Sequence, residues 1–250
     1  MSVKRDFSRI LDLGTPGSTL AAHLTSRGAV TRTAPDAELL GEGGFNGVVA
    51  DEERLPFEPE SFDLAVSALA LHNVNDLPGT LIQVRRALRP DGLFLAALMG
   101  GQSLTELRQA FLRAEEETMG GVSPRVAPFV DLRDLGALMQ RAGFALPVTD
   151  SDVVRVRYAS MFDLMRDLRA MGATNVLVSR SRKPLRRATL LRAAEIYTDM
   201  FSDPDGRVRA TFEIVYLAGW VPHESQQKPL KPGSATVRLA DALKIKDYGE

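Results

Sequence analysis

The sequence predicts an α/β protein in which helices flank a mostly parallel sheet. Three observations lead to this prediction. Strand-like apolar runs alternate with helical patterns from residue 9 to residue 99, as in successive βαβ units. The run SFDLAVSALAL (61–71) has the composition of a strand buried at the centre of a parallel sheet. The first strand ends in an acid and a glycine turn, DLGTPGS, followed by a helix, which is the layout of a nucleotide-binding loop.

The first half of the chain is expected to supply five strands and two helices. The strands are predicted at 9–13, 28–33, 47–50, within 61–71, and at 93–99. Helical spacing predicts helices at 19–26 and 77–88, and the segment RPDG (89–92) ends the second one because proline and glycine interrupt helices.

The second half becomes mainly helical. Helices are predicted at 103–118, 131–142, 161–171 and 185–201, and the first is expected to open with a capping box, SLTE. Two further strands are predicted at 153–158 and 209–221, and the Gly- and Pro-rich segment GGVSPRVAPF (120–129) is predicted to be a loop. Without a repeat or a clear linker, residues 1–250 are expected to form one domain with helical insertions at about 102–130 and 160–205.

Composition excludes several classes of protein. The 250 residues carry a formal net charge of −1, which gives no support to a nucleic-acid partner. The absence of cysteine excludes disulfides, thiolate metal sites and cysteine nucleophiles. No stretch approaches the roughly 20 apolar residues of a membrane span, and the start MSVKRDFSRI has no apolar core of a secretory signal.

Candidate site residues gather where the predicted strands end, because ligands of open α/β sheets bind outside the carboxyl ends of the strands. His72 there is either a pocket residue and general base or a cap of the fourth strand. Arg125, in the predicted loop, either anchors an acidic group of a partner or is solvated. The further candidates are Asp12, Gly14 and Gly17 after the first strand, Asp51 and Glu52 after the third, and Ser67 in the fourth.

Taken together, the glycine loop, the acidic turn and the segments LPF, SFDL and LRPDGLF resemble class I S-adenosylmethionine-dependent methyltransferases. This resemblance implies a Rossmann-like sheet of seven strands and S-adenosylmethionine as cofactor. It implies that the cofactor contacts Asp12, Gly14, Gly17, Asp51, Glu52, Ser67 and His72, with Asp51 facing the adenine. The sequence departs from the family pattern at Pro16 and Ser18, which stand at glycine positions, and at Ala34, where the family has an acid for the ribose. Asp36 lies two residues further on.

Longer blocks resemble a narrower family, the complex I assembly factor 5 (arginine-hydroxylase) proteins and their alphaproteobacterial relatives. These blocks include ADEERLPFEPESFDLAVSALALHNVNDLPGTL, GGVSPRVAPF, MFDLMRDLRAMGATN, GWVPHESQ and PGSATV, within residues 11–239. The resemblance implies hydroxylation of an arginine in the iron–sulfur subunit of respiratory complex I, near its quinone site. It also implies a bacterial cytoplasmic location at the inner face of the inner membrane. The family has tryptophan where this chain has Asn73, and lid helices upstream of the first strand that have no counterpart here.

Two other functions remain open. One is methyl transfer to a small molecule or carrier protein, as in the malonyl-carrier O-methyltransferases of biotin synthesis, which share the front half of the chain. The other is a non-catalytic assembly scaffold, which Pro16 and Ala34 favour. No metal site is predicted, since a triad of His72, His223 and a carboxylate would need residues that nothing in the sequence brings together.

Overall fold

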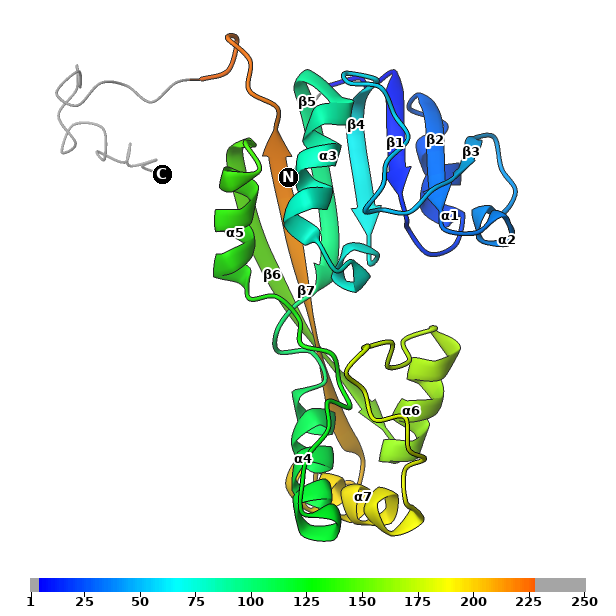
Figure 1. Cartoon of the computed structure of the whole chain (residues 1–250), viewed down its shortest axis with the longest axis vertical. Coiled ribbons are helices and arrows are strands. Elements are labelled where there is room, and N and C mark those ends of the chain that lie inside the picture. The colour runs from blue at the N-terminus through cyan, green and yellow to red at the C-terminus, as the bar shows by residue number, and fades with distance from the viewer. Residues whose placement is uncertain (1–4, 228–250) are drawn as a thin grey trace, which may run out of the picture.

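Seven strands form a single sheet in the order β3-β2-β1-β4-β5-β7-β6 in the computed structural model, which describes residues 5–227 (Figure 1). Strands β1 to β5 are parallel to one another, whereas β7 is antiparallel to both β5 and β6. The prediction of a mostly parallel, seven-stranded sheet is therefore confirmed. The strands are β1 (Arg9–Leu13), β2 (Ala29–Ala34), β3 (Asn46–Val49), β4 (Phe62–Ala68), β5 (Leu88–Met99), β6 (Ala145–Tyr158) and β7 (Val208–Trp220).

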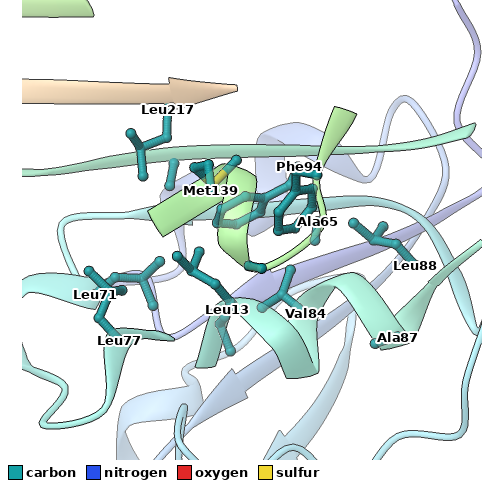
Figure 2. Close-up of a cluster of buried hydrophobic side chains, with 14 of the residues drawn as sticks. Leu13, Ala65, Leu71, Leu77, Val84, Ala87, Leu88, Phe94, Met139 and Leu217 are labelled. Atoms are coloured by element: carbon teal, nitrogen blue, oxygen red, sulfur yellow. The ribbon is translucent and has the colours of Figure 1, made fainter. Parts of the chain in front are cut away.

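Helices on the two faces of the sheet bury its apolar side chains. On one face, α3 (Leu77–Ala87) and α5 (Leu132–Arg141) cover the largest cluster, in which the ring of Phe94 stacks on that of Phe144. Figure 2 shows Phe94, Met139 and Leu217 meeting in this cluster. On the other face, α1 (Thr19–Leu24) packs over β1, β2 and β4, and the short α2 (Ala37–Leu40) follows β2.

Three helices form a separate group, here called the helical lobe, on the far ends of β6 and β7 (Figure 1). They are α4 (Thr105–Met119), α6 (Met161–Ala170) and α7 (Arg187–Phe201). Their cluster includes Phe111, Leu164 and Tyr197, and it closes against Ala210 of β7. The Tyr197 hydroxyl donates to the Arg209 carbonyl oxygen at 2.7 Å. The lobe therefore consists of the two segments that were predicted to be insertions. The paired strands β6 and β7 connect it to the rest of the sheet.

The predicted capping box of α4 is wrong. The residue before this helix, Leu104, has a left-handed backbone (φ 54°), and no side chain caps the helix. Ser103 Oγ instead donates to the Glu213 carbonyl oxygen and accepts from the Glu213 N–H, at 3.1 and 3.0 Å. The Glu106 carboxylate accepts from the N–H and hydroxyl of Thr211. Both members of the expected box are buried and serve to attach α4 to β7.

Two boundaries also differ from the predictions. Helix α3 ends at Ala87, but RPDG is a bulge inside β5 rather than a free turn, with Asp91 at φ 61°. Strand β6 begins at Ala145 rather than at 153, because its first half pairs with β7 although the segment ALPVTDSD has no strict alternation.

Asp63, in β4, holds the start of β1 next to β4. Its carboxylate accepts from the N–H and hydroxyl of Ser8, at 3.0 and 2.7 Å, and from the N–H of Arg9 at 2.9 Å. Burial would raise the pKa of Asp63, but these hydrogen bonds outweigh it and hold the pKa below its usual value.

We expect Asp63→Asn to lower the free energy of unfolding by about 1–3 kcal/mol at pH 7, because hydrogen bonds to a charged acceptor are lost. A lowered native pKa stabilises the fold above the unfolded-state pKa of about 4, and this contribution disappears as the pH falls through the native value. Urea unfolding at pH 7 and near pH 3 should show the difference shrinking in acid. Asp6→Asn, at an exposed position two residues before Ser8, is the control, and an equal loss at both pH values would contradict the assignment.

None of the helices in residues 5–227 is both long and apolar enough to cross a membrane.

Candidate functional site

Several predicted site residues meet at one edge of the sheet. The carboxyl ends of β1, β3, β4 and β5 lie along this edge because these strands are parallel within one sheet. The chain continues from β5 into α4, so the edge is the one nearer the helical lobe (Figure 1). We refer to it as the catalytic edge because His72, the residue that the sequence predicted to be catalytic, lies on it. It carries the loop 12–18, the turn 51–54, and the short helix η1 (Leu71–Asn73) after β4.

Two oppositely charged side chains are buried next to each other on β1 and β2. Asp12 and Arg32 are register partners, so their side chains share one face of the sheet. Asp12 is fully buried, and neither of its carboxylate oxygens has a hydrogen-bond partner within residues 5–227. Burial raises the pKa of Asp12, and the nearby Thr15 hydroxyl and the positive charge of Arg32 offset only part of this shift.

Arg32 also fixes the position of the glycine loop after β1. Its Nη2 donates to the carbonyl oxygens of Thr15 and Leu39, both at 3.0 Å, and its guanidinium lies 5.8 Å from the ring centre of Phe45. Its Nε and Nη1 are buried without a partner in the described part of the chain. Arg32 therefore ties the loop after β1 to α2 while it faces Asp12.

The backbone at Gly14 forms a cradle that a side chain would fill. Gly14 has φ 65°, and its N–H donates to Thr33 Oγ1 at 3.2 Å. A β-carbon at this position would collide with Glu52 Oε1, so the Glu52 carboxylate lies directly over the loop. Burial raises the pKa of Glu52, and the negative charges of Asp51 and Glu53 raise it further. The loop after β1 and the turn after β3 thus bring Gly14 and Glu52 together.

The rest of the loop is held despite its proline. Thr15 Oγ1 accepts from the Ala68 N–H at 3.0 Å, which fastens the loop to the end of β4. Pro16 and Gly17 are exposed at the tip. Gly17 has φ 70°, and open space surrounds the position where its β-carbon would be. Thr15 and Arg32 thus determine the path of the loop, and proline is accommodated at its outer side.

The acids at the ends of β2 and β3 have different roles. Ala34 is buried, and Asp36 Oδ1 accepts from the Glu38 N–H at 3.0 Å as the cap of α2. Asp51 is exposed after β3, where its Oδ1 accepts from the Glu53 N–H at 2.8 Å. The 51–53 turn thus adds three carboxylates to that of Asp12 at the catalytic edge, and Glu53 Oε1 accepts from the backbone N–H and the side-chain amide of Asn75.

His72 lies in η1, at the end of β4. Its Nδ1 is buried without a hydrogen-bond partner among the described residues, so the side chain does not cap the strand. Its ring contacts that of Phe129 edge to face, with the centres 5.8 Å apart. Burial lowers the pKa of His72, which keeps the imidazole neutral at pH 7 and able to accept a proton.

Ser67 lies deeper in the sheet than the other candidates. Its hydroxyl donates to the Leu13 carbonyl oxygen at 2.8 Å, and its side chain is buried. This bond joins β4 to β1 directly beneath the glycine loop, so the hydroxyl is engaged within the sheet.

His223 and His72 lie at opposite edges of the sheet. Because β7 is antiparallel to β5, its end at Trp220 pairs with Leu93 near the start of β5. His223 follows that end, and its Nδ1 is paired with Ser225 Oγ at 2.7 Å. Within residues 5–227, no three histidine, aspartate or glutamate side chains are grouped as metal ligands.

Arg125 is neither free nor solvated. Its guanidinium forms an ion pair with Glu115, with Nη2 and Nε at 2.5 and 2.7 Å from Glu115 Oε1. The other oxygen of Glu115 accepts from the Ser123 N–H at 2.6 Å. The buried Glu115 thus holds the loop 120–130 against α4.

Sequence reasoning missed three buried charges that shape this region: Arg32, Glu106 and Glu115. For Arg32 a signal was present, because the arginine interrupts an otherwise uncharged strand, AVTRTA. The two glutamates lie in a helix rich in exposed charges, so nothing in the sequence pattern separates them from the solvated ones.

Comparison with known proteins supports the class of fold and the narrower resemblance. A family model described as a methyltransferase domain matches residues 11–96. The chain is similar to arginine-hydroxylase NDUFAF5 of Danio rerio, 42% identical over 97% of this chain and 78% of that protein. The human protein of the same name is also 42% identical, over 97% of this chain and 72% of its own length.

More distant similarities agree with the fold. A malonyl-[acyl-carrier protein] O-methyltransferase of Gallionella capsiferriformans is 35% identical over 79% of this chain and 64% of that protein. Among solved structures, the YcgJ protein from Bacillus subtilis gives a TM-score of 0.61 at 15% identity, over 88% of this chain and 94% of that one. Phosphoethanolamine N-methyltransferase 2 of Haemonchus contortus, solved with S-adenosyl-L-methionine, gives 0.54 at 16% identity over 89% of this chain and 50% of that one. These two structures show the fold alone.

Proposed function

Because this chain belongs to the family of arginine-hydroxylase NDUFAF5, we propose that it hydroxylates an arginine side chain of a protein. The observation that carries the proposal is the extent of the similarity. Identity of 42% covers 97% of the chain, so it includes the helical lobe as well as the methyltransferase-like sheet. The carrier-protein methyltransferase relative matches less of the chain at lower identity.

The charges of the catalytic edge suit a cationic substrate. Asp51, Glu52 and Glu53 form an acidic turn beside the glycine loop. A guanidinium is permanently positive, so these carboxylates attract it. His72 is held neutral by burial, and a neutral imidazole accepts a hydrogen bond from a guanidinium where a charged one would repel it. In this proposal the acidic turn binds and orients the arginine, and the neutral His72 accepts a hydrogen bond from it.

For the substrate protein, we propose the iron–sulfur subunit of respiratory complex I near its quinone site, as the sequence resemblance implied. The reaction would then take place in the bacterial cytoplasm, at the inner face of the inner membrane.

The catalytic edge also fits S-adenosylmethionine, the cofactor of the fold class. The fit rests on the cradle at Gly14, on the unpartnered Asp12 carboxylate, and on the acids Asp51 and Glu52. For the methyl-transfer alternative, we propose that Gly14 and Gly17 hold the amino-acid part of the cofactor, and that Asp51 and Glu52 hold its adenosine part in place of an arginine. Glu52 must turn away from Gly14 to admit any ligand. Bound there, S-adenosylmethionine supplies an electrophilic methyl group, which is the chemistry of the methyl-transfer alternative.

The mass of the substrate protein distinguishes the candidate reactions. Incubation of this chain with the iron–sulfur subunit, O₂ and a reductant is expected to add about 16 Da to one arginine-containing peptide. Insertion of one oxygen atom from O₂ into a C–H bond consumes two electrons and two protons and releases water, so the reductant is required. A gain of about 14 Da that depends on S-adenosylmethionine would instead indicate methyl transfer.

His72→Ala is expected to reduce the yield of the hydroxylated peptide, whereas His23→Ala, an exposed position in α1, is the matched control. No mass change with this subunit, together with methylation of malonyl-carrier protein, would favour the second function. No modification of either protein would leave the scaffold as the better description.

A further inference from the structure

A cavity of about 490 Å³ opens between α4 and the loop 120–130. Its walls are mainly apolar and include Phe111, Leu112, Val122, Val126 and Phe129. Leu112 and Val122 are 49% and 58% exposed, so apolar surface continues from the cavity to its rim. A partly exposed apolar cavity of this size is a common form of binding site.

The cavity adjoins the catalytic edge. Gly101, which lines it, is the second residue after β5 at that edge. Phe129 lines it too, and its ring contacts the ring of His72. A substrate segment bound in the cavity would therefore lie next to His72.

Two arginines line the cavity, and they differ in their partners. Arg125 is neutralised by the buried Glu115. Arg108 forms no ion pair within residues 5–227, and its Nη2 lies 3.4 and 3.5 Å from the carbonyl oxygens of Ser103 and Ala127, which is long for such bonds. Ser123 Oγ, also at the cavity, is buried without a partner among the described residues. An apolar wall thus carries one unmatched positive charge and one free hydroxyl.

We propose that this cavity binds a carboxylate carried on an apolar segment of the protein substrate, with Arg108 as its counter-ion. The inference rests on the proposed function, because the cavity lies beside the edge where the substrate arginine would react. A guanidinium pairs with a carboxylate through two parallel hydrogen bonds, and the pairing is stronger beside apolar walls than in water.

The two charged regions together would fix the direction of the substrate. The acidic turn at 51–53 attracts the arginine, and Arg108, on the far side of β4, attracts the acid. A segment bound in the reverse direction would place like charges together at both positions, which is unfavourable.

The first test measures binding of the complex I iron–sulfur subunit to the whole chain at equilibrium, without turnover. Arg108→Glu is expected to weaken binding by about tenfold or more, because a desolvated charge pair becomes a like-charge contact. Arg113→Glu is the matched control, since Arg113 is exposed on the same helix outside the cavity, and it should leave the affinity unchanged. Arg108→Gln is expected to give an intermediate loss, and circular dichroism checks that all three variants are folded.

The second test uses small probes of the cavity itself. Hexanoate is expected to shift the methyl resonances of Leu112 and Val122 at concentrations about tenfold lower than hexanamide, which has the same shape without the charge. Arg108→Gln should remove this preference, whereas Arg113→Gln should retain it.

The outcomes separate this inference from the proposed reaction. Arg108-dependent binding without a mass gain of about 16 Da would support the inference and count against hydroxylation. Hydroxylation with an unchanged KM in Arg108→Glu would leave the reaction standing and overturn the inference. Arg108-dependent binding of hexanoate with no binding of the subunit would also overturn it, since the cavity would then serve a small carboxylate.

Discussion

Replacing Arg32 with methionine is expected to lower the free energy of unfolding by about 3 kcal/mol or more, because two carbonyl oxygens lose a charged donor and the buried Asp12 loses a nearby positive charge. Arg32 is 1% exposed and faces the fully buried Asp12 on the neighbouring strand. Methionine keeps much of the volume but removes the positive charge and the donors to Thr15 and Leu39. Urea unfolding at pH 7 measures the loss. Arg27→Met, at an exposed turn, is the control and should change stability by less than about 0.5 kcal/mol.

A double-mutant cycle with Asp12→Asn assigns the loss to charge. Because burial raises the pKa of Asp12, its ionisation destabilises the fold as the pH rises above the unfolded-state value of about 4. Asp12→Asn should therefore flatten the pH dependence of stability between about pH 4 and pH 7, and it should reduce the penalty of Arg32→Met. An unchanged penalty in the double variant would mean that Arg32 acts through its hydrogen bonds to Thr15 and Leu39 alone.

The second large effect concerns the cradle. Gly14→Ala is expected to weaken S-adenosylmethionine binding by about 100-fold, or about 2.7 kcal/mol, because the new β-carbon strains the loop backbone and occupies the space next to it that Glu52 fills. The unsubstituted chain is expected to bind with a micromolar Kd, about −8 kcal/mol, by titration calorimetry.

Gly17→Ala is the comparison for Gly14→Ala, and it is expected to weaken binding less, although Gly17 is itself a proposed cofactor contact. Both glycines have a positive φ, so both substitutions carry a similar backbone strain of about 1–2 kcal/mol. A β-carbon at position 14 would meet the Glu52 side chain, whereas the space around a β-carbon at position 17 is open. Equal loss of binding in the two variants would show that strain alone is responsible. No binding by the unsubstituted chain would overturn the cofactor assignment but not the family assignment.

Strong periodic patterns made much of the fold predictable. The bounds of β1 were predicted to the residue, and those of α3 and β7 to within one, because each has uninterrupted apolar spacing. The start of β6 was missed because a strand at the edge of a sheet is selected by pairing with β7, which a local pattern does not contain. The capping box at 103–106 failed for the same reason, since β7 competes successfully for both Ser103 and Glu106.

The sequence predicted where the candidate site lies, at the carboxyl ends of the strands. It did not predict which charged side chains near the site are buried or paired. Asp12, Gly14 and Glu52 were identified because strand ends and glycine turns have local signatures. The buried Arg32 and the Glu115–Arg125 pair were not, because burial of a charge depends on distant segments that fold over it. The neutral state of His72 depends likewise on its surroundings, including Phe129.

The position of β7 has a consequence for how the chain folds during synthesis. This strand, which starts only at Val208, lies between β5 and β6 in the sheet and also binds α4 of the lobe through Thr211 and Glu213. Until it has left the ribosome, β5 lacks its outer neighbour and β6 has no partner strand. The sheet and the lobe therefore reach their final packing together, at the end of translation, and an interrupted chain that stops before residue 208 exposes unpaired strands from both.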